Sequence, residues 1–194
     1  MKNIYRILLV AMVILTGACA HPISITPDLA KLDRANVKQS ASKVGYYISD
    51  ADRNLEVITP GGGGDKVKYK PYEQLEPAIQ KVLSNKFARV YSLKKENDSV
   101  EIKSKGITYV FVPKVSTTSS SKSAFTWPPT NFSVTLDCRA VDSTGSTVWQ
   151  KSLTGEGEAQ FKEFKSNFSL SAQRASYNTF KMLEDVLDKE PKFN

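Results

Sequence analysis

Few side chains in this 194-residue chain are of the types that perform catalysis. The one histidine, His21, lies two residues after Cys19, and the other cysteine, Cys138, is distant from both. Nucleophilic catalysis and zinc binding need a histidine, or several thiolates, held together by the fold. Glu156 and Glu158 are two residues apart, which places both on one face of a strand, the usual position of solvated carboxylates. We therefore expect no catalytic residues, no metal site and no cofactor, and predict that the protein is not an enzyme.

Four consecutive glycines, Gly61 to Gly64, precede Asp65 and Lys66 in an order that partly matches a phosphate-binding loop. In a P-loop, Gly-Lys is followed directly by Ser or Thr. Here Asp65 separates the glycines from Lys66, Val67 takes the place of the hydroxyl residue, and the Asp65 carboxylate would repel a phosphate. We predict a flexible linker at this position.

The first eighteen residues have the layout of a secretory signal. Lys2 and Arg6 give a positive start, an apolar run covers 7–15, and small residues lead to Cys19. The apolar run is shorter than the roughly 20 residues that span a bilayer. Residues 15–19, Leu-Thr-Gly-Ala-Cys, resemble the bacterial lipobox, although Leu is commoner than Thr at its second position. The resemblance implies cleavage before Cys19 and acylation of that cysteine; the alternative is an ordinary secreted protein with a chance cysteine there.

The residue after the lipidated cysteine carries sorting information in Gram-negative lipoproteins, in which Asp favours retention in the inner membrane. This chain has Ala20, so the resemblance implies the outer membrane, with the protein facing the periplasm. Removing Lys2 and Arg6 from the formal charge of +7 leaves +5 for the mature chain. These charges are spread along the chain, which indicates a solvated surface, weak attraction to anionic lipid at most, and no nucleic-acid partner.

Periodicity in the remaining chain predicts one domain. Strands are expected at 44–49, 55–58, 88–93, 107–112, 132–140 and 147–154, and helices at 72–87 and from Ser169 to Leu187. Pro77 either marks the true start of the first helix or kinks it. Residues 115–118 are a candidate continuation of the strand at 107–112, and residues 116–123 read as a polar loop. Cys138 lies on the apolar face of its strand. We predict a signal peptide at 1–18, a lipid anchor and tether at 19–40, and a single α+β domain at 41–190.

The order of these elements is not a strict alternation of strands and helices. This argues against a doubly wound parallel sheet. We predict an α+β fold in which an antiparallel or mixed sheet has two helices packed on one face.

A stiff apolar segment, Phe125-Thr126-Trp127-Pro128-Pro129, follows the Ser-rich loop. Aromatic residues are enriched at interaction hot spots, so Phe125, Trp127, Pro128 and Pro129 are candidates for docking a periplasmic protein. In the alternative interpretation, Trp127 folds back over the sheet and the prolines end a strand.

The span from Tyr72 to Leu187 resembles the small Gram-negative outer-membrane lipoproteins of the YajG type, most closely at 134–142, 147–153 and 169–187. That family has no catalytic residues to carry over. The resemblance implies a non-catalytic, membrane-anchored lipoprotein that presents a protein-binding or envelope-assembly domain to the periplasm. The alternative is a lipid- or ligand-binding auxiliary lipoprotein of an envelope transport system, which requires an apolar cavity between sheet and helices.

Overall fold

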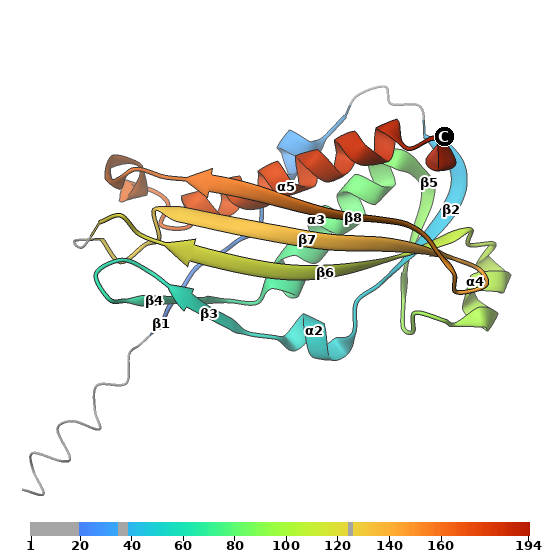
Figure 1. The fold of residues 1–194 in the computed structure, drawn as a ribbon, viewed down its shortest axis with the longest axis horizontal. Coiled ribbons are helices and arrows are strands. Elements are labelled where there is room, and N and C mark those ends of the chain that lie inside the picture. The colour runs from blue at the N-terminus through green and yellow to red at the C-terminus, as the bar shows by residue number, and fades with distance from the viewer. Residues whose placement is uncertain (1–19, 35–38, 124–125) are drawn as a thin grey trace, which may run out of the picture.

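The computed structural model describes residues 20–34, 39–123 and 126–194 (Figure 1). Two sheets with helices form an α+β fold, as predicted; the larger has the strand order β5-β2-β6-β7-β8 and the smaller β1-β4-β3. The strands are β1 (Ala20–Pro22), β2 (Ser40–Tyr47), β3 (Val57–Pro60), β4 (Lys66–Tyr69), β5 (Phe87–Leu93), β6 (Tyr109–Ser120), β7 (Asn131–Asp142) and β8 (Thr147–Glu158). The α-helices are α2 (Asp50–Asn54), α3 (Pro71–Lys86), α4 (Ser99–Lys105) and α5 (Leu170–Lys189), and the 3-10 helices are η1 (Leu29–Leu32), η2 (Phe161–Lys165) and η3 (Pro191–Phe193).

The larger sheet is mixed, because β2 runs parallel to both β5 and β6, while β6, β7 and β8 are antiparallel. Helices α3 and α5 pack against each other and against this sheet on one face, as predicted (Figure 1). The smaller sheet packs against the same face of the larger sheet as these helices. There Tyr69 of β4 contacts the ring of Phe132 and hydrogen-bonds Thr117. We call the face covered in this way the inner face and the opposite one the outer face.

Strand β7 alternates between the two faces with the predicted period of two. Its inner residues are all buried: Phe132, Val134, Leu136, Cys138 and Ala140. On the outer face, β7 carries polar residues such as Ser133, Thr135 and Asp137. Helix α5 supplies the facing layer with a buried stripe that includes Ala172, Ala175, Phe180, Leu183 and Leu187.

Strands β6 and β8 are longer than the sequence indicated. Residues 116–123, predicted to be a polar loop, remain in β6 as far as Ser120, which pairs with Asn131. Strand β8 likewise continues past Thr154 to Glu158. Ser and Thr residues occupy both faces at the end of β6. Because they are equally polar, the alternation between half-buried and exposed positions does not appear in the hydropathy of the sequence.

The prediction of a flexible linker at Gly61–Gly64 is wrong. These residues form the tight turn between β3 and β4, closed by the Gly61 N–H, which donates to the Asp65 carbonyl at 2.8 Å. The Gly62 N–H donates to the Trp127 carbonyl at 2.9 Å, and a Cβ on Gly62 would lie 1.7 Å from the Thr126 carbonyl oxygen. Glycine is required because another backbone passes directly against the turn.

The described residues of the predicted tether, 19–40, also differ from expectation. Strand β1 pairs in parallel with β4, and Ile23, Ile25 and Leu32 are buried. The Ile25 N–H donates to the Gln74 side chain of α3 at 2.8 Å. A tether would leave these apolar side chains in water, whereas here they fill the space between the smaller sheet and the helices.

Helix α3 begins at Pro71, one residue before the expected start at 72, and Pro77 lies inside it rather than at its start. Proline at the first helical position is favourable because its missing N–H has no partner within the helix. Pro191 follows the end of α5, two residues beyond Lys189.

Candidate functional site

Two regions of the molecule offer surfaces for interaction, and the first adjoins the predicted lipidation site. Cys19 itself lies outside the described residues. Ala20, the next residue, is already part of β1 and pairs with Lys66 of β4. One peptide bond therefore separates position 19 from the sheet, a distance of about 3.8 Å between Cα atoms. In the part of the chain that the structure describes, no helix has both the length and the apolar character to cross a bilayer.

A stack of three rings stands beside this start of the chain. The His21 and Trp127 rings lie 4.4 Å apart between centroids at an interplanar angle of 27°, and Trp127 contacts Phe168 at 5.0 Å. His21 Nε2 also lies 3.7 Å from a carboxylate oxygen of Asp65. The sequence placed His21 in a tether; contacts between such distant segments leave no local signal in the sequence.

The predicted docking residues divide into three groups. Phe125 lies outside the described residues. Pro128 and Pro129 are buried, and the Pro129 carbonyl accepts a hydrogen bond from Ser171 of α5 at 2.6 Å. Trp127 is half-buried. Pro129 thus seats the segment against α5, and the two prolines precede β7 rather than end a strand, while part of Trp127 stays accessible.

The segment after β8 adds further aromatic and basic residues to this end, which sequence reasoning missed. Phe161 of η2 is 66% exposed and Phe168 is 51% exposed. Lys162 and Lys165 are also exposed, whereas Phe164 points inward and is buried. The aromatic and basic residues of η2 are visible in its sequence, Phe-Lys-Glu-Phe-Lys, but a single 3-10 turn is too short for hydrophobic periodicity to show which of them are exposed.

An ion pair fixes η2 to helix α5. Both guanidinium NH groups of Arg174 donate to the Glu163 carboxylate, at 2.7 and 3.2 Å. These hydrogen bonds lower the pKa of Glu163 to about 2. The Gln160 N–H also donates to Glu163 at 2.8 Å, so the turn that carries Phe161 is held from both sides.

The second region is the outer face of β6, β7 and β8. At one end of this face, α4 covers it through a buried cluster of Ile102 with Val110, Val112 and Val141. Beyond that cluster the cross-strand rows consist of polar side chains, most of them short: Lys114, Ser116, Thr118 and Ser120 on β6; Asn131, Ser133, Thr135 and Asp137 on β7; Ser152, Thr154, Glu156 and Glu158 on β8. Hydroxyls bond across the strands, from Thr118 to Ser133 at 2.7 Å and from Thr135 to Thr154 at 2.8 Å.

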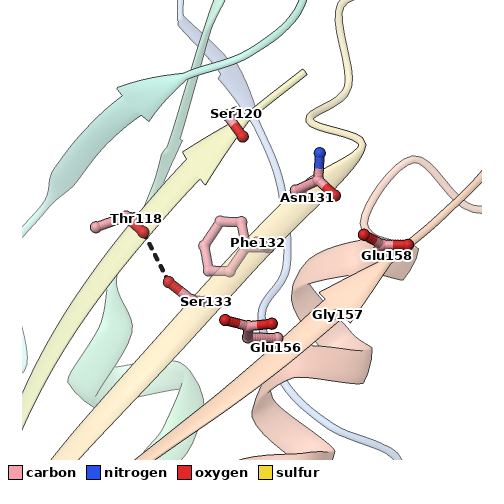
Figure 2. Close-up of a pocket in the computed structure, with 8 residues that line it drawn as sticks. All are labelled: Thr118, Ser120, Asn131, Phe132, Ser133, Glu156, Gly157 and Glu158. Carbon is pink, nitrogen blue, oxygen red and sulfur yellow. Dashed lines mark hydrogen bonds between the residues drawn. The ribbon is translucent and has the colours of Figure 1, made fainter. Parts of the chain in front are cut away.

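Figure 2 shows a shallow hollow of about 220 Å³ at the open end of this face. It is lined by Thr118, Ser120, Asn131, Phe132, Ser133, Glu156, Gly157 and Glu158. Glu156 and Glu158 are exposed at its rim, as their spacing on one strand face indicated. The lining offers hydroxyl, amide and carboxylate groups, which suit hydrogen bonding to a polar partner.

Cys138 is buried on the inner face of β7, as predicted. Burial raises the pKa of its thiol to about 12, so the thiolate that acts as a nucleophile does not form at neutral pH. Over residues 20–34, 39–123 and 126–194, the His, Cys, Asp and Glu side chains form no group of three that could hold a metal ion.

No family model and no curated protein matches this chain. Among solved structures, it is similar to protein XCC0632 from Xanthomonas campestris, of the DUF330 family (TM-score 0.46, 10% identity, 87% of this chain and 91% of that one). It is also similar to the PelC dodecamer from Paraburkholderia phytofirmans (TM-score 0.47, 14% identity, 78% and 91%). A third similar structure is a putative lipoprotein from Caulobacter crescentus CB15 (TM-score 0.33, 12% identity, 74% and 88%). These similarities are too low to support an argument about function, which therefore has to rest on the residues of this chain.

Proposed function

We propose that the protein is a non-catalytic lipoprotein held at the periplasmic face of the outer membrane by acyl chains on Cys19. Its domain presents a binding surface to another envelope protein. The lipobox-like segment 15–19 supports the anchor, and Ala20 supports the outer membrane. The observation that carries the binding role is the open outer face of β6–β8. This long polar surface is uncovered in the described part of the chain, whereas the inner face of the same strands is buried beneath the helices.

The fate of Cys19 can be read from a count of thiols. An acylated, mature chain has Cys138 as its one free thiol, whereas an unmodified chain has two. Protein purified from membranes would be denatured, treated with maleimide and analysed by intact mass. We expect one adduct on the wild type, none on Cys138→Ala, and a mass increase from the acyl chains; an adduct on Cys138→Ala would contradict acylation.

Sorting to the outer membrane is tested separately with Ala20→Asp. Membranes would be separated by density and the protein located by immunoblot, with Ala20→Ser as the matched control. The proposal expects wild type and Ala20→Ser in the outer membrane and Ala20→Asp in the inner membrane. Wild-type protein in the inner-membrane fraction would overturn the location while leaving the anchor intact.

The binding role is tested with photo-crosslinking residues at two exposed positions. Thr154 lies on the outer face and Asp185 on the solvent side of α5. We expect a discrete adduct from position 154 and none from position 185. The adduct from position 154 should be lost when Thr118, in the adjacent cross-strand row, is also changed to Arg. Adducts that form equally at both positions, or that persist in Thr118→Arg, would show that the outer face is not the docking surface.

The ligand-binding alternative needs an apolar cavity between sheet and helices. Aromatic side chains occupy that place: Phe111 lies 5.6 Å from Phe87, 5.5 Å from Phe193 and 6.1 Å from Trp149 between ring centroids. Their contacts favour a structural core at this position, so the protein-binding role is the one we propose.

A further inference from the structure

We propose that one end of the domain lies directly on the bilayer that holds the acyl chains, inserting aromatic side chains among the lipid headgroups. We call this the membrane-facing end and define it by His21, Trp127, Phe161, Phe168, Lys162 and Lys165. The inference rests on the proposed acylation of Cys19 and adds the orientation of the domain to it.

The first step concerns the absence of a spacer between lipid and fold. Strand β1 begins at Ala20 and is held by β4, and the next apolar residues, Ile23 and Ile25, are buried. The chain could lengthen the connection only by breaking this pairing and exposing both side chains. The headgroup region of each leaflet is about 5–8 Å thick. A domain that starts one residue from the acylated cysteine must therefore touch it.

The second step is the kind of side chain found there. Trp127 stacks on His21, two residues from the acylation site, and Phe168 packs on Trp127 with 51% of its surface exposed. Phe161, 66% exposed, lies on η2 at the same end of the molecule (Figure 1). Trp concentrates at membrane interfaces, and Phe is among the residues that insert into the boundary between headgroups and acyl chains. In water, the same exposure of Phe161 and Phe168 is unfavourable.

The third step is charge. Lys162 and Lys165 follow Phe161 on η2 and are exposed. Within the described residues neither forms an ion pair, and Glu163, which lies between them in the sequence, is bound to Arg174. Two cations beside exposed aromatics suit the anionic headgroups of a bilayer. A protein partner at this place would have to share the space with the acyl chains, which favours the membrane as the occupant.

The two tryptophans of the chain make the test direct. Trp149 is 6% exposed in the aromatic core, so it serves as an internal reference for Trp127. Mature protein purified from membranes, with Cys19 as the cell leaves it, would be reconstituted into vesicles of phosphatidylcholine and phosphatidylglycerol with bromine on the acyl chains close to the headgroups. In Trp149→Phe, which leaves Trp127, we expect a blue shift and loss of about half of the emission. In Trp127→Phe, which leaves Trp149, we expect neither.

Wild-type protein provides the same measurement if Trp149→Phe reduces stability, since buried Trp149 then contributes a constant background. The lysines are tested by varying the phosphatidylglycerol content. Quenching of Trp127 should rise with anionic lipid, and this dependence should be lost in the double variant Lys162→Gln/Lys165→Gln but kept in Lys151→Gln/Lys189→Gln, which changes two exposed lysines elsewhere.

Flotation of the vesicles separates the two proposals. Protein that floats with the vesicles while Trp127 stays unquenched would overturn the membrane-facing end and leave the anchor standing. Protein that does not float would overturn the acylation of Cys19, and the orientation with it.

Discussion

The two faces of the central sheet are built from the same strands but have opposite characters. On the inner face, Val134 and Leu136 are buried beneath α5, whereas on the outer face their neighbours Thr135 and Thr154 exchange a hydrogen bond in contact with water. Inner side chains are fixed by close packing, so their volume is constrained. Outer side chains contribute little to folding and are free to serve recognition. The difference predicts that stability and the proposed binding can be varied separately in this protein.

The largest effect is expected from the inner face. Leu136→Ala would leave a cavity between β7 and α5, and such substitutions cost about 2–5 kcal/mol. Urea unfolding followed by circular dichroism measures this loss. Thr135→Ala, one residue away on the outer face, is the matched control and should change the free energy of unfolding by less than about 0.5 kcal/mol. Equal losses for the two variants would contradict the comparison.

A smaller effect is expected where α5 rests on β8. A Cβ at Gly157 would lie 2.0 Å from the Ser171 carbonyl oxygen and 2.4 Å from the Ala175 nitrogen, both backbone atoms of α5. Gly157→Ala should therefore push the helix away and destabilise the fold by about 1–3 kcal/mol, the usual cost of overpacking. The thermal midpoint measures it, with Ser152→Ala on the same strand as the control. An unchanged midpoint for Gly157→Ala would show that α5 is not seated on β8 in this way.

A still smaller, pH-dependent effect is expected from a polar link within the inner layer. Arg53 of α2 donates to the Glu76 carboxylate of α3 at 2.8 and 2.9 Å, and Tyr46 of β2 donates to it at 3.0 Å. The hydrogen bonds from Arg53, and then the one from Tyr46, lower the pKa of Glu76 below 4.5. A lowered carboxyl pKa stabilises the fold above the unfolded-state pKa, and this stabilisation is lost as the pH falls through the folded-state value.

Glu76→Gln should accordingly cost about 1 kcal/mol at pH 7, because charged hydrogen bonds are stronger than neutral ones but this pair is partly solvated. The difference from wild type should shrink as the pH falls below about 4.5. Chemical denaturation at a series of pH values measures both. Glu156→Gln, on the exposed outer face, is the control, and a pH-independent difference for Glu76→Gln would rule out the charge as its cause.

The smallest effect is expected from the outer face itself. Replacing both Thr135 and Thr154 by Val removes donor and acceptor together, which is nearly neutral for stability. We expect the free energy of unfolding to stay within about 0.5 kcal/mol of wild type, while a photo-crosslinking residue placed at the exposed neighbouring position 118 no longer forms an adduct with the partner. A large destabilisation would mean that the outer face belongs to the structural core, against the distinction between the faces.

Much of the central sheet could be predicted because burial and periodicity agree there. Every second residue of β7 from Phe132 to Ala140 is apolar, and the stripe on α5 has a helical period, so both elements and their buried faces follow from the sequence. Where side chains are small and polar on both faces, as at Ser116 to Ser120, the strand is set by pairing with β7, and pairing is not visible in hydropathy.

The sites were less predictable because they depend on contacts between distant segments. The Trp127 ring is positioned by His21 and Phe168, and its carbonyl by Gly62, each from a different part of the chain. Four glycines indicate freedom when taken alone, but here they permit the close approach of another backbone. The same holds for Ile23 and Ile25, whose short alternating stretch gave no indication that a sheet and a helix would cover it.

The pairing of β1 with β4 also determines how far the domain can extend from the membrane. A flexible linker of 20 residues would let a domain explore distances of about 25 Å. With acyl chains on Cys19 and the sheet beginning at Ala20, that radius shrinks to the length of a single residue. With the proposed anchor, the domain cannot move away from the membrane to search for its proposed partner, so that partner has to come within the domain's own height of the bilayer.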